Sequence, residues 1–461
     1  MSLIFKQFLT EAMGDASYLI GDDGARVAAV IDPQVDIQKY VDAARSHGLA
    51  LKYVFQTHIH EDFLSGARAL SCMVPGAEIC LSGHNAPTYG FPHRLVQDGE
   101  VFKLGSTLLT VRHTPGHTPE HISLLAAQAE DETPFAVFSG GSLLVGAAGR
   151  TDLLGKEHVD ALTDQQFHTL HDFFLGLGDG VAIYPTHVHG SPCGAAIGDK
   201  VSSTIGFERH HNPLLQAGSE AAFREVALGN LPPKPSYYPR LKCRNTESQP
   251  ESGPRMAVAP LPAQEFAALV KRGTASLVDT RHMLAFGGGH IAEALNIGAA
   301  GHLSIWAGWM LDPEKPLLLV LDSDSQLPAV LTHFARTGFD KFAGYLAGGM
   351  SAWANAGLTM KATPQLHASS LAGQNGDVLA LDIRSPQEWE AGHVPGARHI
   401  FLPELPRRLE EIPKDKPVAV YCDSGYRASI GASILQQNGF DAMSVPGSWQ
   451  AWKALDLPVE R

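Results

Sequence analysis

The sequence has few cysteines, and their placement excludes two kinds of site. It holds five, an odd number, scattered over 461 residues without a C-x-x-C pair, so neither a disulfide framework nor a cysteine-only zinc site is predicted. Basic residues are also scarce: 35 Lys and Arg against 48 Asp and Glu give a net charge of −13. An acidic surface repels phosphate backbones and anionic lipids, so nucleic acid is not expected as a partner.

Long apolar runs are missing as well. No uncharged stretch approaches the roughly 18–20 residues that span a membrane, and the first residues lack the basic start and apolar core of a signal peptide. We therefore expect a soluble, cytoplasmic protein with no membrane partner, in which homo-oligomerisation stays open. At about 150 residues per domain, the length predicts about three domains.

Histidine is unevenly distributed along the chain, and the second half contains an internal sequence repeat. Fifteen of the 22 histidines fall at or before His211, and residues 230–255 are rich in Pro, Ser and charge, which predicts a linker or extended segment. After it, landmarks recur in order about 100 residues apart: DTR at 279–281 and DIR at 382–384, GHI at 289–291 and GHV at 392–394, GFD at 338–340 and 439–441, and AW at 352–353 and 451–452. Each repeat predicts a small α/β domain with parallel strands. The predicted domains are residues 1–250, 256–360 and 362–461.

Three histidine-rich turns follow predicted strands in the first domain. In the segment THIHED, alternation points His58, His60 and Asp62 to one side of an extended chain, where they can converge on a cation. The turns around His117 and His187 follow later strands. Three such turns at strand ends predict a metal centre.

Residues 1–245 resemble the metallo-β-lactamase fold, an αββα sandwich, and within it the persulfide dioxygenase branch that is often fused to rhodanese domains. The motifs that carry the resemblance are THIHEDFLSG (57–66), TPGHTPEH (114–121), GRTDLLG (149–155), HGSPCG (189–194) and STIGFER (203–209). The resemblance implies one ferrous ion per chain with His58 and His117 as ligands. It places His60, Asp62 and His187 where the binuclear hydrolases of the wider fold bind metal.

Two departures from the family pattern change the expected ligands. Phe63 stands where the wider fold has a second-site histidine, and Gly141 stands where the family has the aspartate that ligates metal. A binuclear hydrolase therefore lacks two ligands. A mononuclear site for Fe(II), or alternatively Zn, can still be formed by His58, His60 and His117. Asp62 or His187 can also serve as a ligand. A degenerate, metal-free domain is the alternative, and Cys193 is expected to pack a glycine-rich turn.

A cysteine loop follows a predicted strand in the last domain. Cys422 precedes a predicted helix, so backbone N–H groups and the positive charge of Arg427 favour its thiolate. With DIRSPQEWEAGHVPGARHI (382–400), the loop resembles the rhodanese sulfurtransferases. The resemblance implies that Cys422 carries sulfane sulfur as a persulfide, from thiosulfate or a thiol persulfide to an acceptor thiol. Catalysis is assigned to Cys422 and Arg427, and substrate binding to the loop residues Asp423, Ser424, Gly425 and Tyr426.

The middle domain has no such cysteine, because Leu321 aligns with Cys422 and no cysteine lies between 243 and 422. We predict an inactive rhodanese-like domain there. Asp382 and Arg384 are expected to brace the fold. Three functional hypotheses follow: a sulfurtransferase fused to a metal-dependent persulfide dioxygenase-like domain, a sulfurtransferase with a degenerate metal domain, and a zinc-dependent thioester hydrolase of the glyoxalase II type.

Overall fold

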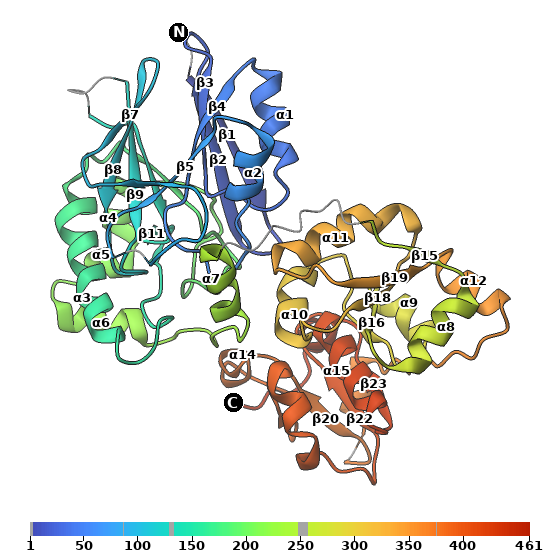
Figure 1. Cartoon of the computed structure of the whole chain (residues 1–461). Coiled ribbons are helices and arrows are strands. Elements are labelled where there is room, and N and C mark those ends of the chain that lie inside the picture. Colours follow the sequence, from blue (N-terminus) through green and yellow to red (C-terminus); the bar gives the residue numbers. More distant parts are fainter. Residues whose placement is uncertain (1–2, 86, 129–132, 248–256, 375) are drawn as a thin grey trace. The chain divides into compact units, whose positions relative to one another are not determined.

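The computed structural model describes residues 3–85, 87–128, 133–247, 257–374 and 376–461 (Figure 1). The chain forms two compact units, Met1–Pro254 with Ala335–Gly338, and Arg255–Phe334 with Phe339–Arg461. Each unit is described by itself. Among the described residues, no helix combines the length and the apolar composition needed to cross a membrane.

The first unit contains two six-stranded sheets. One has the order β1 (Leu3–Thr10), β2 (Asp15–Asp22), β3 (Val27–Ile31), β4 (Ala50–Phe55), β5 (Glu78–Ser82) and β6 (Arg94–Val96). The other has the order β14 (Ser203–Thr204), β13 (Ala182–Pro185), β10 (Ala136–Gly140), β9 (Ile122–Ala127), β8 (Thr107–His113) and β7 (Val101–Leu104). Buried side chains of both sheets, such as Tyr18, Phe55, Leu124 and Phe138, form one core between them.

Helices cover the outer faces of this sandwich. Residues of α1 (Gln38–Ser46) and α2 (Ala67–Met73) pack on the first sheet, and residues of α4 (Ile205–His211), α5 (Pro213–Gln216) and α6 (Glu220–Leu228) pack on the second. Helix α3 (Val159–His168) contacts α6. The predicted αββα sandwich is confirmed, since alternating apolar residues give each sheet one face for the shared core and one for a helical layer.

One segment differs from its prediction. Residues 238–246 of the expected linker form a helix, α7 (Tyr238–Thr246), whose side chains Tyr238, Leu241 and Asn245 are buried. Asn245 fixes it, because its Nδ2 donates to the backbone oxygens of His60 and Phe63 at 2.8 and 2.9 Å. The density of proline and charged residues therefore led to the prediction of a linker where the chain forms a helix. The rest of the expected linker includes residues 248–255, which lie outside the described residues.

The second unit contains two parallel sheets. The first has the order β15 (Pro260–Leu261), β19 (Phe342–Leu346), β18 (Leu317–Val320), β16 (Ser276–Asp279) and β17 (Leu295–Asn296), with helices α8 (Ala263–Arg272), α9 (Met283–Gly288), α10 (Leu303–Met310), α11 (Leu327–Arg336) and α12 (Gly349–Asn355). The other has the order β21 (Arg398–His399), β20 (Leu379–Asp382), β22 (Val418–Tyr421) and β23 (Ala442–Ser444), with helices α13 (Ala368–Ala372), α14 (Pro386–Glu390), α15 (Tyr426–Gln437) and α16 (Ser448–Ala454). The predicted parallel sheets are confirmed.

The repeat has the same internal geometry in both copies. Nη2 of Arg281 donates to Asp279 at 2.6 Å and to the Gly289 carbonyl at 2.8 Å, and Arg384 does the same to Asp382 and Gly392 at 2.6 and 2.8 Å. Each buried Asp–Arg pair ties the end of a strand to the turn after the next helix. We retain 256–360 and 362–461 as the proposed bounds of the two domains.

Candidate metal centre and sulfur-transfer loop

The turn after β4 holds two of the predicted metal ligands. His58 Nδ1 lies 2.9 Å from the hydroxyl of Thr57, which leaves His58 Nε2 facing His187 Nε2 at 3.3 Å. His60 is turned differently: its Nε2 lies 3.0 Å from Asp32 Oδ1, while its Nδ1 is buried with no hydrogen-bond partner. Thr57 therefore holds Nδ1 of His58, and Asp32 holds Nε2 of His60. In the described part of the chain, the other ring nitrogen, Nε2 of His58 and Nδ1 of His60, has no hydroxyl or carboxylate partner.

His187 follows β13 and lies at the centre of the cluster. Its Nδ1 is 3.1 Å from Asp15 Oδ1 and 3.3 Å from Asp62 Oδ2, and all three side chains are buried. Burial alone lowers the pKa of His187, but the two carboxylates outweigh it and raise that pKa to about 10. Burial raises the pKa of Asp15 well above its ordinary value, with the neighbouring charge of Asp62 acting in the same direction.

His117 is held by the backbone of a distant loop. Its Nδ1 donates to the Arg150 carbonyl at 2.9 Å, and burial is the main cause that lowers the pKa of His117 to about 3. His121 also lies nearby, but Thr114 and the Gly141 amide bond its two ring nitrogens at 2.8 and 2.9 Å. His121 is therefore a structural residue.

Donor atoms of the cluster come together in three sets. Within each set, one atom per residue lies within 4.8 Å of the others; the sets are His58, His60 and His187; His117, His187 and Cys193; and Asp15, Asp62 and His187. His187 belongs to all three. Among the described residues, none of these sets joins His58 to His117, the two ligands that the family resemblance implies.

The buried donors fit a metal ion. His60 Nδ1 and Asp62 Oδ1 are buried without a hydrogen-bond partner, whereas Asp62 Oδ2 faces His187 Nδ1 at 3.3 Å. Buried donor atoms without a partner are costly unless a cation or proton satisfies them. Imidazole nitrogens suit iron and zinc alike. The two-histidine, one-aspartate set of the dioxygenases does not fit, because residue 141 is glycine.

The cysteine loop connects β22 to α15. Cys422 Sγ is buried and accepts a hydrogen bond from the Gly425 amide at 3.1 Å. Gly425 has φ +110°, a conformation that side chains disfavour, and it turns this amide toward the sulfur. The Cys422 amide donates to Ser448 Oγ at 3.1 Å. The loop therefore holds the sulfur at the start of a twelve-residue helix, with one backbone N–H directed at it.

Arg427 is paired with a residue that the sequence did not single out. Its two terminal nitrogens each donate to a carboxylate oxygen of Glu388 at 2.7 Å. Burial opposes the ionisation of Glu388, but the hydrogen bond and charge of Arg427 lower its pKa to about 2. Ser385 and Glu388 also form a capping box at the start of α14. The position of Arg427 is thus set by a bidentate ion pair.

The remaining loop residues have different surroundings. Ser424 is exposed, and Asp423 Oδ2 accepts a hydrogen bond from Gln450 at 2.7 Å. Tyr426 donates its hydroxyl hydrogen bond to the Gly298 carbonyl, 2.8 Å away in the preceding repeat. This contact makes Tyr426 an anchor between the two repeats of the second unit.

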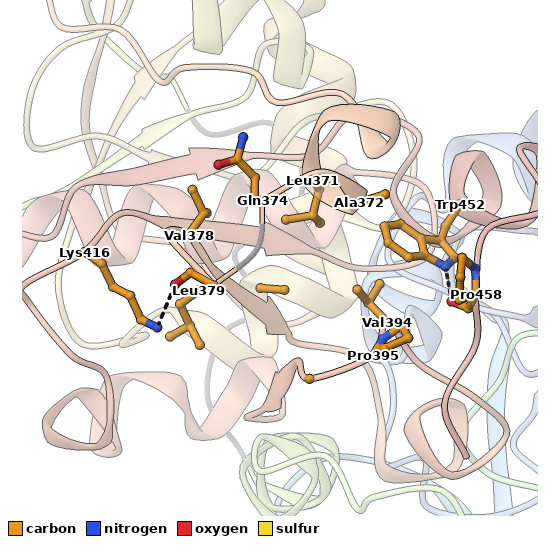
Figure 2. A pocket seen from close by; sticks show the side chains of 13 residues that line it. Leu371, Ala372, Gln374, Val378, Leu379, Val394, Pro395, Lys416, Trp452 and Pro458 are labelled. Atoms are coloured by element: carbon orange, nitrogen blue, oxygen red, sulfur yellow. Dashed lines mark hydrogen bonds between the residues drawn. The ribbon is translucent and has the colours of Figure 1, made fainter.

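A separate cavity of about 380 Å³ lies in the domain of Cys422 (Figure 2). Leu371, Val394 and Trp452 line it, and Lys416 donates to the Gly376 carbonyl at its edge. The cavity includes the start of β20, whereas Cys422 follows the end of β22, the parallel neighbour of β20. The cavity therefore lies toward the amino ends of these parallel strands, whereas the sulfur lies at their carboxyl ends.

Comparison with known proteins accounts for both units. Residues 262–356 and 367–455 match the family described as Rhodanese-like domain. A metallo-beta-lactamase of known structure from Staphylococcus aureus subsp. aureus COL is 30% identical with a TM-score of 0.67, and the match covers 75% of this chain and 99% of that one. The chain belongs to the metallo-β-lactamase-fold proteins that carry rhodanese-like domains.

Two curated relatives match parts of this fusion protein. The mitochondrial persulfide dioxygenase ETHE1 of Bos taurus is 29% identical over 221 residues, which are 47% of this chain and 77% of the relative. A sulfurtransferase of Allochromatium vinosum is 38% identical over 84 residues, which are 18% of this chain and 78% of the relative. These similarities place the metallo-β-lactamase–rhodanese fusion among enzymes of sulfur metabolism.

The first rhodanese-like repeat differs from the second at the cysteine position. Leu321 directly follows β18, as Cys422 follows β22, and its side chain is buried in the apolar core. The carboxylate of Asp324 accepts a hydrogen bond from the Gly348 amide at 3.2 Å. His290 and His393 each bond a backbone carbonyl of the preceding turn, at 3.0 and 3.1 Å. Both histidines are thus shared features of the fold.

Proposed function

We propose that this protein is a sulfurtransferase that carries sulfane sulfur on Cys422. The observation that carries the proposal is the hydrogen bond from the Gly425 amide to Cys422 Sγ at 3.1 Å, in a loop that opens a helix. Such amides lower the free energy of a thiolate and of the negatively charged terminal sulfur of a persulfide. A cysteine that only fills the core does not require a backbone amide directed at its sulfur.

The transfer takes place in two displacements. The Cys422 thiolate attacks the outer sulfur of thiosulfate; the new S–S bond forms while the old one breaks, and sulfite leaves with the electron pair. An acceptor thiolate then attacks the outer sulfur of the Cys422 persulfide, which forms the acceptor persulfide and restores the Cys422 thiolate. A low-molecular-weight persulfide replaces thiosulfate in the same scheme, with its thiolate as the leaving group.

Arg427 has the charge to bind the anionic donor beside Cys422. Its ion pair with Glu388 fixes the guanidinium plane, and part of the Arg427 side chain remains exposed, at 17%. Asp423 and Ser424 contribute the polar surface of the loop, and Gly425 its inward-facing amide. Leu321 excludes covalent sulfur transfer in the first repeat, because it has no sulfur atom to form the persulfide.

We further propose that the first unit binds one metal ion, Fe(II) or Zn, and acts on a thiol persulfide. His58, His60, His117 and His187 would hold the ion, with Asp62 within the cluster. Bound iron would supply activation of O₂, so that the four-electron oxidation of the persulfide to sulfite and free thiol would be matched by the four-electron reduction of O₂, with one water consumed. Asp15 and Asp32 orient His187 and His60 through the ring nitrogens that they contact.

A second candidate is a sulfurtransferase whose first unit is only a scaffold, and Gly141 favours it because the family carboxylate is absent. Metal analysis of full-length protein purified without chelator, together with O₂ uptake and sulfite formation from glutathione persulfide, separates the two. About one iron per chain with O₂ uptake supports the dioxygenase-like activity. Absence of uptake at full iron occupancy contradicts it, and zinc with thioesterase activity supports the glyoxalase II type instead.

For the sulfurtransferase proposal, Cys422→Ser is compared with Cys72→Ser and Cys243→Ser, which replace exposed cysteines. We expect thiosulfate-dependent transfer to be abolished only in Cys422→Ser. Transfer retained by that variant overturns the assignment.

A further inference from the structure

Cys193 lies inside the histidine cluster of the first unit. Its Sγ, a ring nitrogen of His117 and a ring nitrogen of His187 all lie within 4.8 Å of one another, and the three residues are buried. A buried thiol that only packs a turn needs no such neighbours. Two imidazoles and a thiol at this separation are a ligand set that soft and borderline metal ions prefer.

The same residue positions both His117 and Cys193. The Arg150 carbonyl accepts the hydrogen bond of His117 Nδ1 at 2.9 Å, and the Arg150 amide donates to the Cys193 carbonyl, also at 2.9 Å. The Arg150 side chain holds this turn further, because Nη1 donates to the Pro192 carbonyl at 3.1 Å. The backbone of Arg150 therefore connects the imidazole of His117 to the turn that carries the thiol of Cys193.

The Nε2 atoms of His117 and His187 are the ring nitrogens available to a metal ion. Arg150 occupies Nδ1 of His117 and Asp15 contacts Nδ1 of His187, which leaves Nε2 of each ring for a metal ion. Nε2 of His187 also lies 3.3 Å from Nε2 of His58. Second partners of this kind orient metal-bound histidines in proteins. The Tyr238 hydroxyl lies 3.4 Å from Cys193 Sγ, where it can donate a hydrogen bond to a thiolate.

We propose that Cys193 is a metal ligand of this protein, in a set with His117 and His187 that replaces the carboxylate lost at position 141. The inference rests on the proposed metal centre. Binding releases the thiol proton of Cys193 and the Nε2 proton of His187 to solvent as the two metal–ligand bonds form, with no change of oxidation state. A thiolate ligand also distinguishes this site from an all-nitrogen and carboxylate site.

Cobalt(II) titration of the full-length Cys422→Ser variant tests the assignment, because cobalt–thiolate bonds give a charge-transfer absorption band. We expect the band in that background and its loss on adding Cys193→Ser, with affinity reduced more than about 100-fold, beyond what loss of an outer partner costs. Cys80→Ser, which removes another buried thiol of the same unit, should leave the band unchanged.

X-ray absorption on the zinc-loaded Cys422→Ser protein gives a second readout that needs no change at Cys193. We expect one sulfur neighbour at about 2.3 Å from zinc. Metal binding with only nitrogen and oxygen neighbours, or a band that survives Cys193→Ser, overturns this inference and leaves the metal centre standing. Failure of the protein to bind any metal overturns both, while the Cys422 assignment is unaffected.

Discussion

The ring of His117 occupies the space beside Gly141: a Cβ atom on Gly141 would lie 2.3 Å from Cδ2 of His117. The same ring also packs against Gly149, where a Cβ atom would lie 2.7 Å from its Cγ. His117 is thus seated between two glycines. A side chain at position 141 would therefore collide with the His117 ring unless that ring moved.

Gly141→Asp should therefore not restore a dioxygenase-type ligand set by itself. We expect it to lower the free energy of unfolding by about 1–3 kcal/mol, as overpacked core sites do, measured by urea unfolding. Gly176→Asp is the matched control, because that glycine is exposed and has open space around it. Unchanged stability of Gly141→Asp, together with tighter iron binding, would contradict the steric account.

Gly425→Ala should abolish sulfur transfer and destabilise the protein by more than about 1 kcal/mol. The residue has φ +110°, and a Cβ atom would lie 3.0 Å from Sδ of Met283. Gly439→Ala is a close control, since Gly439 has φ +77° with nothing near its Cβ position. That variant should lose stability but keep transfer. If Gly425→Ala transfers sulfur at the normal rate, the loop amide has no role in catalysis.

The ion pair of Glu388 and Arg427 should make stability depend on pH in acid. Because the pKa of Glu388 is lowered to about 2 in the folded protein, its stabilisation is fully present above the unfolded pKa, near 4.3, and is lost as pH falls toward 2. The stability difference between wild type and Glu388→Gln should be constant from pH 5 to 8 and shrink below it.

Urea unfolding across this range measures that difference, and Glu390→Gln on the same helix, at an exposed position, is the control. A difference that does not change between pH 5 and 3 would show that the pair is not formed. Sulfur transfer should also fall in Glu388→Gln, because Arg427 loses the partner that orients it.

Tyr426→Phe separates anchoring from substrate binding. Removing the hydroxyl that bonds the Gly298 carbonyl should cost about 0.5–1.5 kcal/mol of stability, with little change in KM for thiosulfate. Thermal unfolding and steady-state kinetics measure the two effects. A raised KM with unchanged stability would instead make Tyr426 a contact of the substrate.

The sequence was sufficient to predict the fold class and the cysteine loop because both depend on local pattern. Alternation and the repeated Asp–Arg pairs predict the sheets. The bracing expected of Asp382 and Arg384 is seen in their bidentate contact, in which Nε donates to Oδ1 at 3.0 Å and Nη2 donates to Oδ2 at 2.6 Å. Leu321 could be aligned with Cys422 from the repeat alone. Each of these signals lies within a few residues of its partner or recurs in register.

Other site residues carry no local signal. Asp15 meets His187 across 172 positions of the chain, and Glu388 meets Arg427 across 39. Asp32 contacts both Thr57 and His60 although it stands alone in the sequence. These partners depend on which strand ends face each other, and periodicity does not determine that. Cys193 was expected to pack a turn for the same reason.

The central claim, that Cys422 carries the transferred sulfur, is tested most directly by mass spectrometry of the full-length protein after reaction with thiosulfate. The peptide that contains Cys422 should gain the mass of one sulfur atom and lose it again on addition of an acceptor thiol, and Cys422→Ser should gain nothing. Turnover with an unmodified Cys422, or with the added sulfur on another cysteine, would contradict the account.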